Sequence, residues 1–168
     1  MYAILKYGAE KANESIKNLG YIIHCFRCFH RETVKAPSLI EHGGRCSKCG
    51  SKVDFAGPLW LRKLSEKQFC NLMEREAERR ALKNGERIRK ILALVKGEVD
   101  APITYYVLDK LCHKLALPAP SVKTLLEVLR EKGFQAYLTH FNPKGMRTDA
   151  PVMDISGFLQ TVVASLKR

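Results

Sequence analysis

Four cysteines in two close pairs are the clearest sign of chemistry in this sequence. Two residues separate Cys25 from Cys28, two separate Cys46 from Cys49, and seventeen lie between the pairs. A two-residue gap lets both sulfurs of a pair reach one ion about 2.3 Å away, and two pairs complete a tetrahedral thiolate shell. We therefore predict a zinc site, which is structural because protein ligands fill all four positions. The alternatives are two disulfides or four unrelated thiols.

A strong positive charge is the second clue. The 168 residues include 29 Lys or Arg and 17 Asp or Glu, giving a formal net charge of +12. Such a field attracts polyanions, and nucleic acid is the commonest polyanion in a cytoplasm. The alternative is a soluble surface with surplus lysines. No apolar run approaches the roughly 18 residues that span a bilayer, and the first residues lack a secretory signal pattern. We therefore expect a cytoplasmic protein with reduced cysteines and no membrane partner.

The other cysteines and the nearby histidines are not needed for the metal site. Cys70 and Cys112 fall on apolar faces of predicted helices, so we expect them to be buried in a core. His24, His30 and His42 flank the four cysteines. Any of the three could substitute as a ligand, but we predict that they face the surface or RNA.

A basic segment is the first candidate contact with nucleic acid. Residues 62–90 contain ten Lys or Arg and five Glu. Arg75, Arg79 and Lys83 recur four apart, so on one helix they would form a stripe that follows a phosphate backbone. The alternative is a solvated face held by i,i+4 pairs such as Glu76 with Arg80. Both interpretations stay open.

A polar loop is the second candidate contact. Residues 139–151 read Thr-His-Phe-Asn-Pro-Lys-Gly-Met-Arg-Thr-Asp-Ala-Pro. The Asn-Pro-Lys-Gly turn fixes the path of the chain and is predicted to expose Lys144 and Arg147. With His140 and Asn142, these residues are predicted to bind RNA. The alternative is a rigid wing tip.

Apolar periodicity and turn residues predict an α+β fold in two domains. Residues 1–56 are predicted to form a strand–helix–strand unit (2–7, 9–18, 21–25) that carries a four-cysteine zinc ribbon. Residues 57–168 are predicted to form helices near 65–84, 86–96, 107–115, 121–132 and 157–166, with a strand at 134–138. Three helices followed by a β element are typical of a winged helix-turn-helix, so this region is predicted to be helical and winged-helix-like.

Two serines are predicted to begin helices. Ser65 with Gln68 matches a capping box, in which the serine hydroxyl and the glutamine side chain satisfy free amides of the first turn. Ser121 precedes an apolar run and is predicted to cap the helix over residues 121–132. Gly57-Pro58 and Gly85 are predicted to interrupt the chain between elements.

These residues together resemble the tRNA (guanine-N2) dimethyltransferases. Residues 139–151 look like the C-terminal signature of that family, whose members methylate the exocyclic amine of guanosine 26 in tRNA. Gly57-Pro58-Leu59-Trp60 resembles the family's Gly-Pro-(Leu/Met/Ile)-Trp motif, and the cysteine pairs precede it in the expected order. The resemblance spans essentially the whole chain. It implies a tRNA-binding, C-terminal accessory domain that positions tRNA for methylation.

The family's catalytic motifs are missing from the sequence. No glycine-rich loop follows a strand near the start, and there is no Asp-Pro-Phe-type motif to position the target amine. The resemblance therefore implies that S-adenosylmethionine binds to an absent N-terminal class I methyltransferase domain, in cis or on a separate chain. We expect this chain alone to be inactive, with zinc as its own cofactor and with tRNA and that domain as partners.

Three other functions fit parts of the pattern. A zinc-ribbon and winged-helix DNA-binding regulator would read bases through residues 121–132, but these contain no Asn or Gln, so base readout would be poor. A structural module completing a partner domain would bind a methyltransferase domain tightly and RNA weakly. An independent enzyme would use Asp149 with Asp154 or His140 as an acid–base pair, and nothing in the sequence fixes their geometry.

Overall fold

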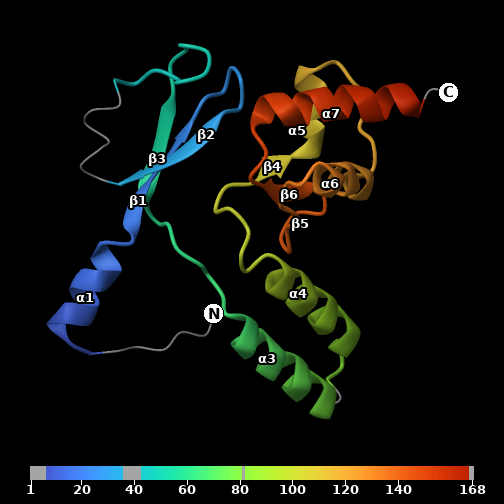
Figure 1. The fold of residues 1–168 in the computed structure, drawn as a ribbon. Coiled ribbons are helices and arrows are strands. Elements are labelled where there is room, and N and C mark those ends of the chain that lie inside the picture. Colours follow the sequence, from blue (N-terminus) through green and yellow to red (C-terminus); the bar gives the residue numbers. More distant parts are fainter. Residues whose placement is uncertain (1–6, 36–42, 81, 167–168) are drawn as a thin grey trace. The chain divides into compact units, whose positions relative to one another are not determined.

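The computed structural model describes residues 7–35, 43–80 and 82–166. They divide into two compact units, Met1–Arg62 and Lys63–Arg168. Six helices and two three-stranded sheets occur in this part of the chain (Figure 1). The mixture of helices and strands expected from the sequence is therefore confirmed. Apart from Tyr7, the strand predicted at residues 2–7 lies outside the described residues.

The first unit is built around one antiparallel sheet. Helix α1 (Ala9–Ile16) leads into β1 (Leu19–His24), as the sequence predicted. Strand β1 lies in the centre of the sheet, between β2 (Arg31–Lys35) and β3 (Asp54–Trp60). The segments that connect β1 to β2 and β2 to β3 contain the cysteines, so this sheet positions the predicted metal ligands.

Strand β3 continues through the Gly57-Pro58 step that was predicted to interrupt the chain. The peptide bond between these residues is cis, and Gly57 has a φ of 153°. A Cβ atom on Gly57 would lie 2.6 Å from the Tyr21 ring and 2.8 Å from the Gly20 carbonyl oxygen. Only glycine fits where β3 approaches β1 this closely. The Gly-Pro-Leu-Trp motif therefore belongs to the sheet of the first unit.

The second unit begins with two helices that pack on each other, α3 (Lys67–Arg79) and α4 (Gly85–Gly97). Ser65 does not cap α3, because Glu66 occupies the N-cap position and no side chain caps it. Gly85 begins α4 instead of ending the preceding helix. The predicted capping box is therefore wrong, and the first helix is shorter than expected.

Asp100, just after α4, forms ion pairs with two lysines near the start of α3. Its two carboxylate oxygens contact the ammonium groups of Lys63 and Lys67. These hydrogen bonds lower the pKa of Asp100 to about 2, so the ion pairs persist across the physiological pH range. Lys96 on α4 also pairs with Glu74 on α3 at 2.6 Å.

The remainder of the second unit forms a small sheet covered by helices. In chain order the elements are β4 (Tyr106–Val107), α5 (Leu108–Lys114), α6 (Val122–Glu131), β5 (Ala136–Leu138), β6 (Gly145–Thr148) and α7 (Val152–Ser165). The sheet order is β4-β6-β5, with antiparallel pairs. Fully buried side chains from α5, α6, β6 and α7 build the core, including Leu108, Leu125, Leu129, Met146, Ile155 and Leu159. Cys70 and Cys112 are buried, as predicted.

The predicted cap of α6 is confirmed, and it has a measurable consequence. The Ser121 hydroxyl oxygen accepts a hydrogen bond from the Lys123 N–H at 3.2 Å. Ser121→Ala is therefore expected to lower the free energy of unfolding by about 1 kcal/mol in urea titrations. Ser165→Ala is the control, because that hydroxyl only donates to a carbonyl of its own helix. Equal effects of the two substitutions would contradict the capping role.

Candidate metal centre and nucleic-acid interface

Two turns of the same backbone design carry the four cysteines. In each turn the N–H of the first cysteine donates to the carbonyl five residues later, and its carbonyl accepts from the N–H four residues later. These distances are 3.0 and 2.8 Å at Cys25, and 2.7 and 2.9 Å at Cys46. The residue after the second cysteine takes a left-handed conformation in both turns, with φ of 60° at Phe29 and 69° at Gly50. The paired spacing therefore corresponds to two equivalent turns.

The turns bring the four sulfurs together. Cys25 Sγ lies 3.5 Å from Cys49 Sγ, Cys28 Sγ lies 3.6 Å from Cys46 Sγ, and all four sulfurs lie within 4.8 Å of one another. A disulfide requires about 2.05 Å, and the four thiols are free. A tetrahedral site with zinc–sulfur bonds of about 2.3 Å has sulfur–sulfur edges of about 3.8 Å. The cluster therefore has the dimensions of a tetrahedral thiolate shell.

The four thiols differ in their surroundings. Cys25 and Cys46 are buried, and Cys49 is exposed. Hydrogen bonds from the Ser51 side chain and amide lower the pKa of Cys49 to about 6, whereas burial raises the pKa of Cys28 to about 12. The Lys48 N–H also points at Cys46 Sγ, at 3.4 Å. Backbone donors of this kind stabilise negative charge on a ligating sulfur.

The cysteines are also the core of the first unit. Its buried hydrophobic cluster consists of Ile23, Val53, Cys25 and Cys46, with Cys28 and Val34 packed against it. Only two buried aliphatic side chains therefore support this sheet among the residues that the structure describes. A core this small rarely stabilises a domain by itself, and a structural metal is one of the usual additions.

The flanking histidines have other contacts. The His24 ring packs edge-on to Phe26, with ring centroids 4.3 Å apart, and His30 Nε2 lies 3.3 Å from the Ser47 hydroxyl. Within the described ranges, the metal-ligand cluster contains cysteines alone. His42 lies outside the described residues.

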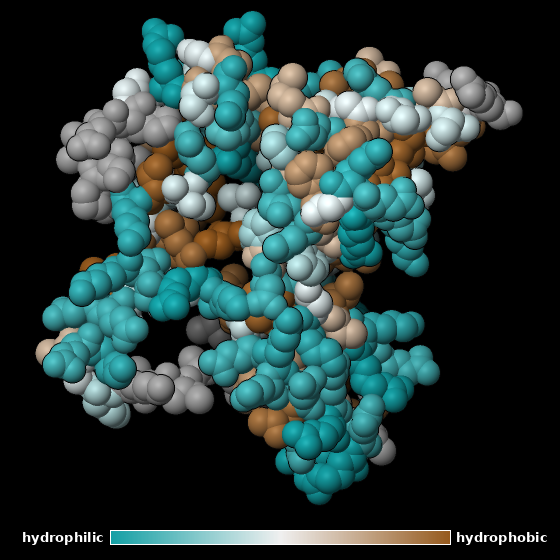
Figure 2. Space-filling model, in the orientation of Figure 1, coloured by the Kyte–Doolittle hydropathy of each residue, from teal (hydrophilic) through white to brown (hydrophobic). Residues whose placement is uncertain are grey.

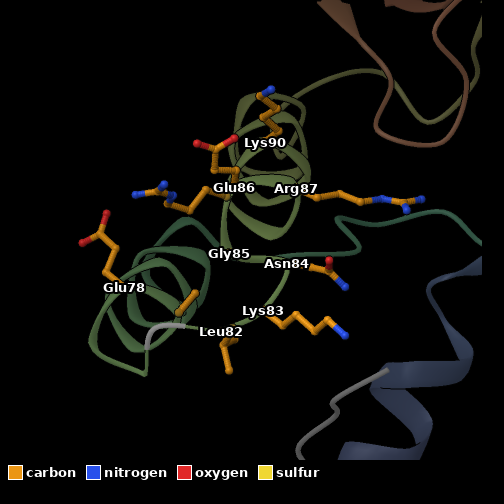
Figure 3. A pocket seen from close by; sticks show the side chains of 10 residues that line it. Glu78, Leu82, Lys83, Asn84, Gly85, Glu86, Arg87 and Lys90 are labelled. Carbon is orange, nitrogen blue, oxygen red and sulfur yellow. The ribbon is translucent and has the colours of Figure 1, made fainter.

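A cationic depression lies where α3 turns into α4 (Figure 3). Its charged lining residues are Lys83, Arg87, Arg89, Lys90, Glu78 and Glu86. Figure 3 shows Lys83, Asn84 and Arg87 extending to one side, away from Glu78 and Glu86. In the space-filling view the surface over these two helices is mostly hydrophilic (Figure 2). One side of this turn therefore presents cations to solvent, next to the amino end of α4.

The predicted stripe of cations along one helix is wrong in one position. Arg75 and Arg79 lie exposed on α3, but the helix ends at Arg79, and Lys83 lies in the turn that follows. Arg79 donates to both carboxylate oxygens of Glu76, at 3.2 and 3.0 Å, and Arg80 donates to Glu76 at 3.0 Å. The solvated ion-pair interpretation therefore describes this part of α3, and other cations gather at the turn.

The loop that begins at Thr139 is fixed by its own hydrogen bonds. Thr139 is buried and donates through Oγ1 to the Asn142 carbonyl oxygen at 2.8 Å. Asn142 Oδ1 accepts from the Lys144 N–H at 2.9 Å, and a Cβ atom on Gly145 would lie 2.4 Å from Thr139 Oγ1. Asn142 therefore shapes the turn, and Lys144 is exposed, as predicted.

Arg147 is not exposed, and this prediction is wrong. Its side chain is 11% exposed, and Nη1 donates to the carbonyl oxygens of Pro102 and Ile103, both at 2.9 Å. Its Nε lies 2.8 Å from Glu98 Oε2, in an ion-pair contact without the alignment of a hydrogen bond. Arg147 therefore joins β6 to the segment that follows α4.

Glu98 is a buried carboxylate at the loop that the sequence analysis missed. Its side chain is 6% exposed, and Oε1 contacts His140 Nδ1 and accepts from the His140 N–H at 3.2 Å. Two of the four predicted RNA-binding residues of the loop thus converge on one buried carboxylate. No local pattern identifies Glu98, because its partners lie more than forty residues away.

Comparisons with known proteins place the chain in a family. Residues 1–160 match the sequence profile described as N2,N2-dimethylguanosine tRNA methyltransferase. A tRNA (guanine(26)-N(2))-dimethyltransferase from Methanobrevibacter smithii is 35% identical over 98% of this chain and 42% of its own length. A tRNA (guanine(26)-N(2)/guanine(27)-N(2))-dimethyltransferase from Aquifex aeolicus is 36% identical over 89% of this chain and 36% of its own.

A solved structure gives the same result. The complex of Trm1 from Pyrococcus horikoshii with S-adenosyl-L-methionine matches 92% of this chain with a TM-score of 0.72 and 27% identity. The match covers 38% of that chain. This chain therefore spans about two fifths of the length of the relatives it matches.

Proposed function

This chain belongs to the N2,N2-dimethylguanosine tRNA methyltransferase family, and we propose that it is the tRNA-binding, C-terminal accessory part of such an enzyme. It would position tRNA for methylation of the guanine-26 N2 amine by a class I methyltransferase domain, in cis or on a separate chain. That domain would bind S-adenosylmethionine, and this chain alone would be inactive. The cationic side of the α3–α4 turn is the observation that carries the proposal.

The α3–α4 turn has the properties of a phosphate-binding surface. Lys83 and Arg87 extend to the same side (Figure 3), and Arg87 belongs to the first turn of α4. Phosphate groups are attracted by cations and by the positive end of a helix dipole. In a chain with a net charge of +12, this surface would bind the tRNA backbone.

The arrangement of β4, α5, α6, β5 and β6 supports a winged-helix-like region, with β5 and β6 as the wing. Helix α6 would then be the recognition helix. Arg130 on α6 donates from Nε and Nη2 to the Ala136 carbonyl oxygen, at 2.9 and 2.6 Å. A cation used in this way is not available to base edges, so α6 is poorly equipped for sequence-specific DNA reading. This favours tRNA binding over a DNA-binding regulator.

Zinc would be the structural cofactor of this part. Cys25, Cys28, Cys46 and Cys49 would hold the ion, and their four sulfurs leave no position for water or substrate. The site would therefore do no chemistry. It would join the two connecting segments of the first unit's sheet into one folded body.

Removing two cations tests the phosphate-binding role. Lys83→Ala with Arg87→Ala is expected to weaken tRNA binding and to reduce the slope of log affinity against log salt by about 0.7 to 0.9 for each phosphate that is no longer neutralised. The matched control is Lys11→Ala with Lys17→Ala, which removes two exposed cations from α1 and its C-cap. Gel-shift titrations at low and at physiological salt would measure both variants. An unchanged slope in the first variant would exclude this surface as the phosphate-binding site.

A further inference from the structure

We infer that Tyr105, His140 and Phe141 form a stacking site for one unpaired base of the tRNA. This inference rests on the proposed tRNA-binding function. It adds Tyr105 and Phe141 to His140, which the sequence pattern had already indicated as an RNA contact. These three residues are called the aromatic platform. They all belong to the second unit.

The aromatic platform is assembled from two distant segments. The Phe141 and Tyr105 ring centroids lie 4.9 Å apart with an interplanar angle of 85°. The Phe141 and His140 centroids lie 5.1 Å apart at 88°. Phe141 therefore contacts two perpendicular rings, one from its own loop and one from the segment before β4. Edge-to-face contacts of this kind fix the orientation of aromatic rings.

The platform is exposed to solvent, and buried charged residues contact it from within the protein. Phe141 is 49% exposed, the highest value in the platform, and Tyr105 is 36% exposed. The Arg147 guanidinium lies over the Phe141 ring, 5.9 Å from its centroid. Glu98 holds both Arg147 and His140. Buried charge therefore positions a ring that remains open to solvent.

The neighbouring groups favour a nucleobase over a protein partner. Lys144 is three residues from Phe141, and its side chain is 48% exposed. Its ammonium group lies 3.6 Å from Asp109 Oδ1 in a surface ion pair, so this cation is accessible to a phosphate beside a stacked base. The residues between them, Asn142 and Pro143, are part of a polar turn, so the apolar surface is small for a protein interface. Unpaired bases stack readily on Phe, Tyr and His, because every base has a π-face.

Replacing the Phe141 ring with an aliphatic side chain tests the inference. Phe141→Leu in the full chain is expected to weaken tRNA binding about 5- to 150-fold. The salt slope should not change, because the variant removes a stacking surface and keeps every phosphate-binding cation. Phe141→Trp is expected to bind as well as the wild type or better. The control is Met153→Ala, which removes an exposed apolar side chain from α7 and should leave binding unchanged.

A fluorescent base provides a direct measurement. The probe is a set of tRNAs that each carry 2-aminopurine at one unpaired position, and one of them should be quenched by the wild type and not by Phe141→Leu. Equal affinity and equal quenching for both proteins would overturn the aromatic platform while leaving the proposed function intact. Absence of any tRNA binding by the wild type would instead refute the proposed function. If Phe141→Leu weakened only the association with a methyltransferase domain, the surface would be a protein-docking site and the inference would be wrong.

Discussion

Cys46→Ser is expected to lower the zinc content from one equivalent per chain to well below half and to unfold the sheet of the first unit. The variant lacks one thiolate ligand, and the remaining three cannot close the tetrahedral shell. Apparent binding free energies of structural zinc reach about 10 kcal/mol or more, and this energy is folding energy wherever the site forms only on folding. The effect should be large because Cys46 is also part of the small buried core.

Metal analysis with circular dichroism checks this outcome. Cys70→Ser is the matched control, because Cys70 is a buried thiol outside the four-cysteine cluster, so the zinc content should stay at one equivalent. Chelation of the wild type should reproduce the loss of structure seen in Cys46→Ser. A full equivalent of zinc in Cys46→Ser, or a chelated wild type with an unchanged spectrum, would contradict a structural zinc site.

Arg147→Met is expected to lower the free energy of unfolding of the second unit by about 3 to 5 kcal/mol. The substitution leaves Glu98 buried without its cation and leaves the carbonyl oxygens of Pro102 and Ile103 without their donor. Glu98 keeps its contacts with His140 but loses the permanent charge of Arg147, and a buried carboxylate without that charge accounts for most of a loss of this size. Urea unfolding, followed by a signal from the second unit, would measure it.

Two further variants separate the contribution of the Glu98–Arg147 ion pair to stability from that of other charges in the loop. Lys144→Met removes an exposed cation from the same loop and should change stability little. Glu98→Leu combined with Arg147→Met removes both charges and should recover much of the stability that Arg147→Met alone removes. A destabilisation by Arg147→Met no larger than that by Lys144→Met would show that the buried pair does not hold the loop.

The clustering of the four cysteines could be predicted almost completely from the sequence, because the information for it is local. Two residues between the cysteines of a pair determine a turn, and two such turns bring four sulfurs together. The strands around the turns were harder to predict. All of β3 is exposed, with a Gly-Pro step in its centre, so it lacks the alternation that identifies a strand. Its close approach to β1 became visible only in the structure.

The loop at residues 139–151 shows the opposite case. Its composition suggested a surface rich in RNA-binding groups, but most of these groups form hydrogen bonds or ion pairs within the protein. Arg147 and His140 both contact the Glu98 carboxylate, and Asp149 accepts a hydrogen bond from the Gln135 N–H at 2.8 Å. A charged residue in a sequence gives no sign of whether its partner lies forty residues away. Among the cationic and aromatic side chains of the loop, Lys144, His140 and Phe141 remain exposed. The third residue of the aromatic platform, Tyr105, comes from outside the loop.

Titration of the zinc-loaded chain with tRNA at several salt concentrations tests the proposed function. We predict saturable binding of tRNA, stronger than binding of duplex DNA of similar length, with an affinity that falls linearly on a log–log plot as salt rises. The slope divided by about 0.7 to 0.9 gives the number of phosphates that are neutralised. Binding that is absent, independent of salt, or stronger for duplex DNA would contradict the proposal that this chain is a tRNA-binding accessory part.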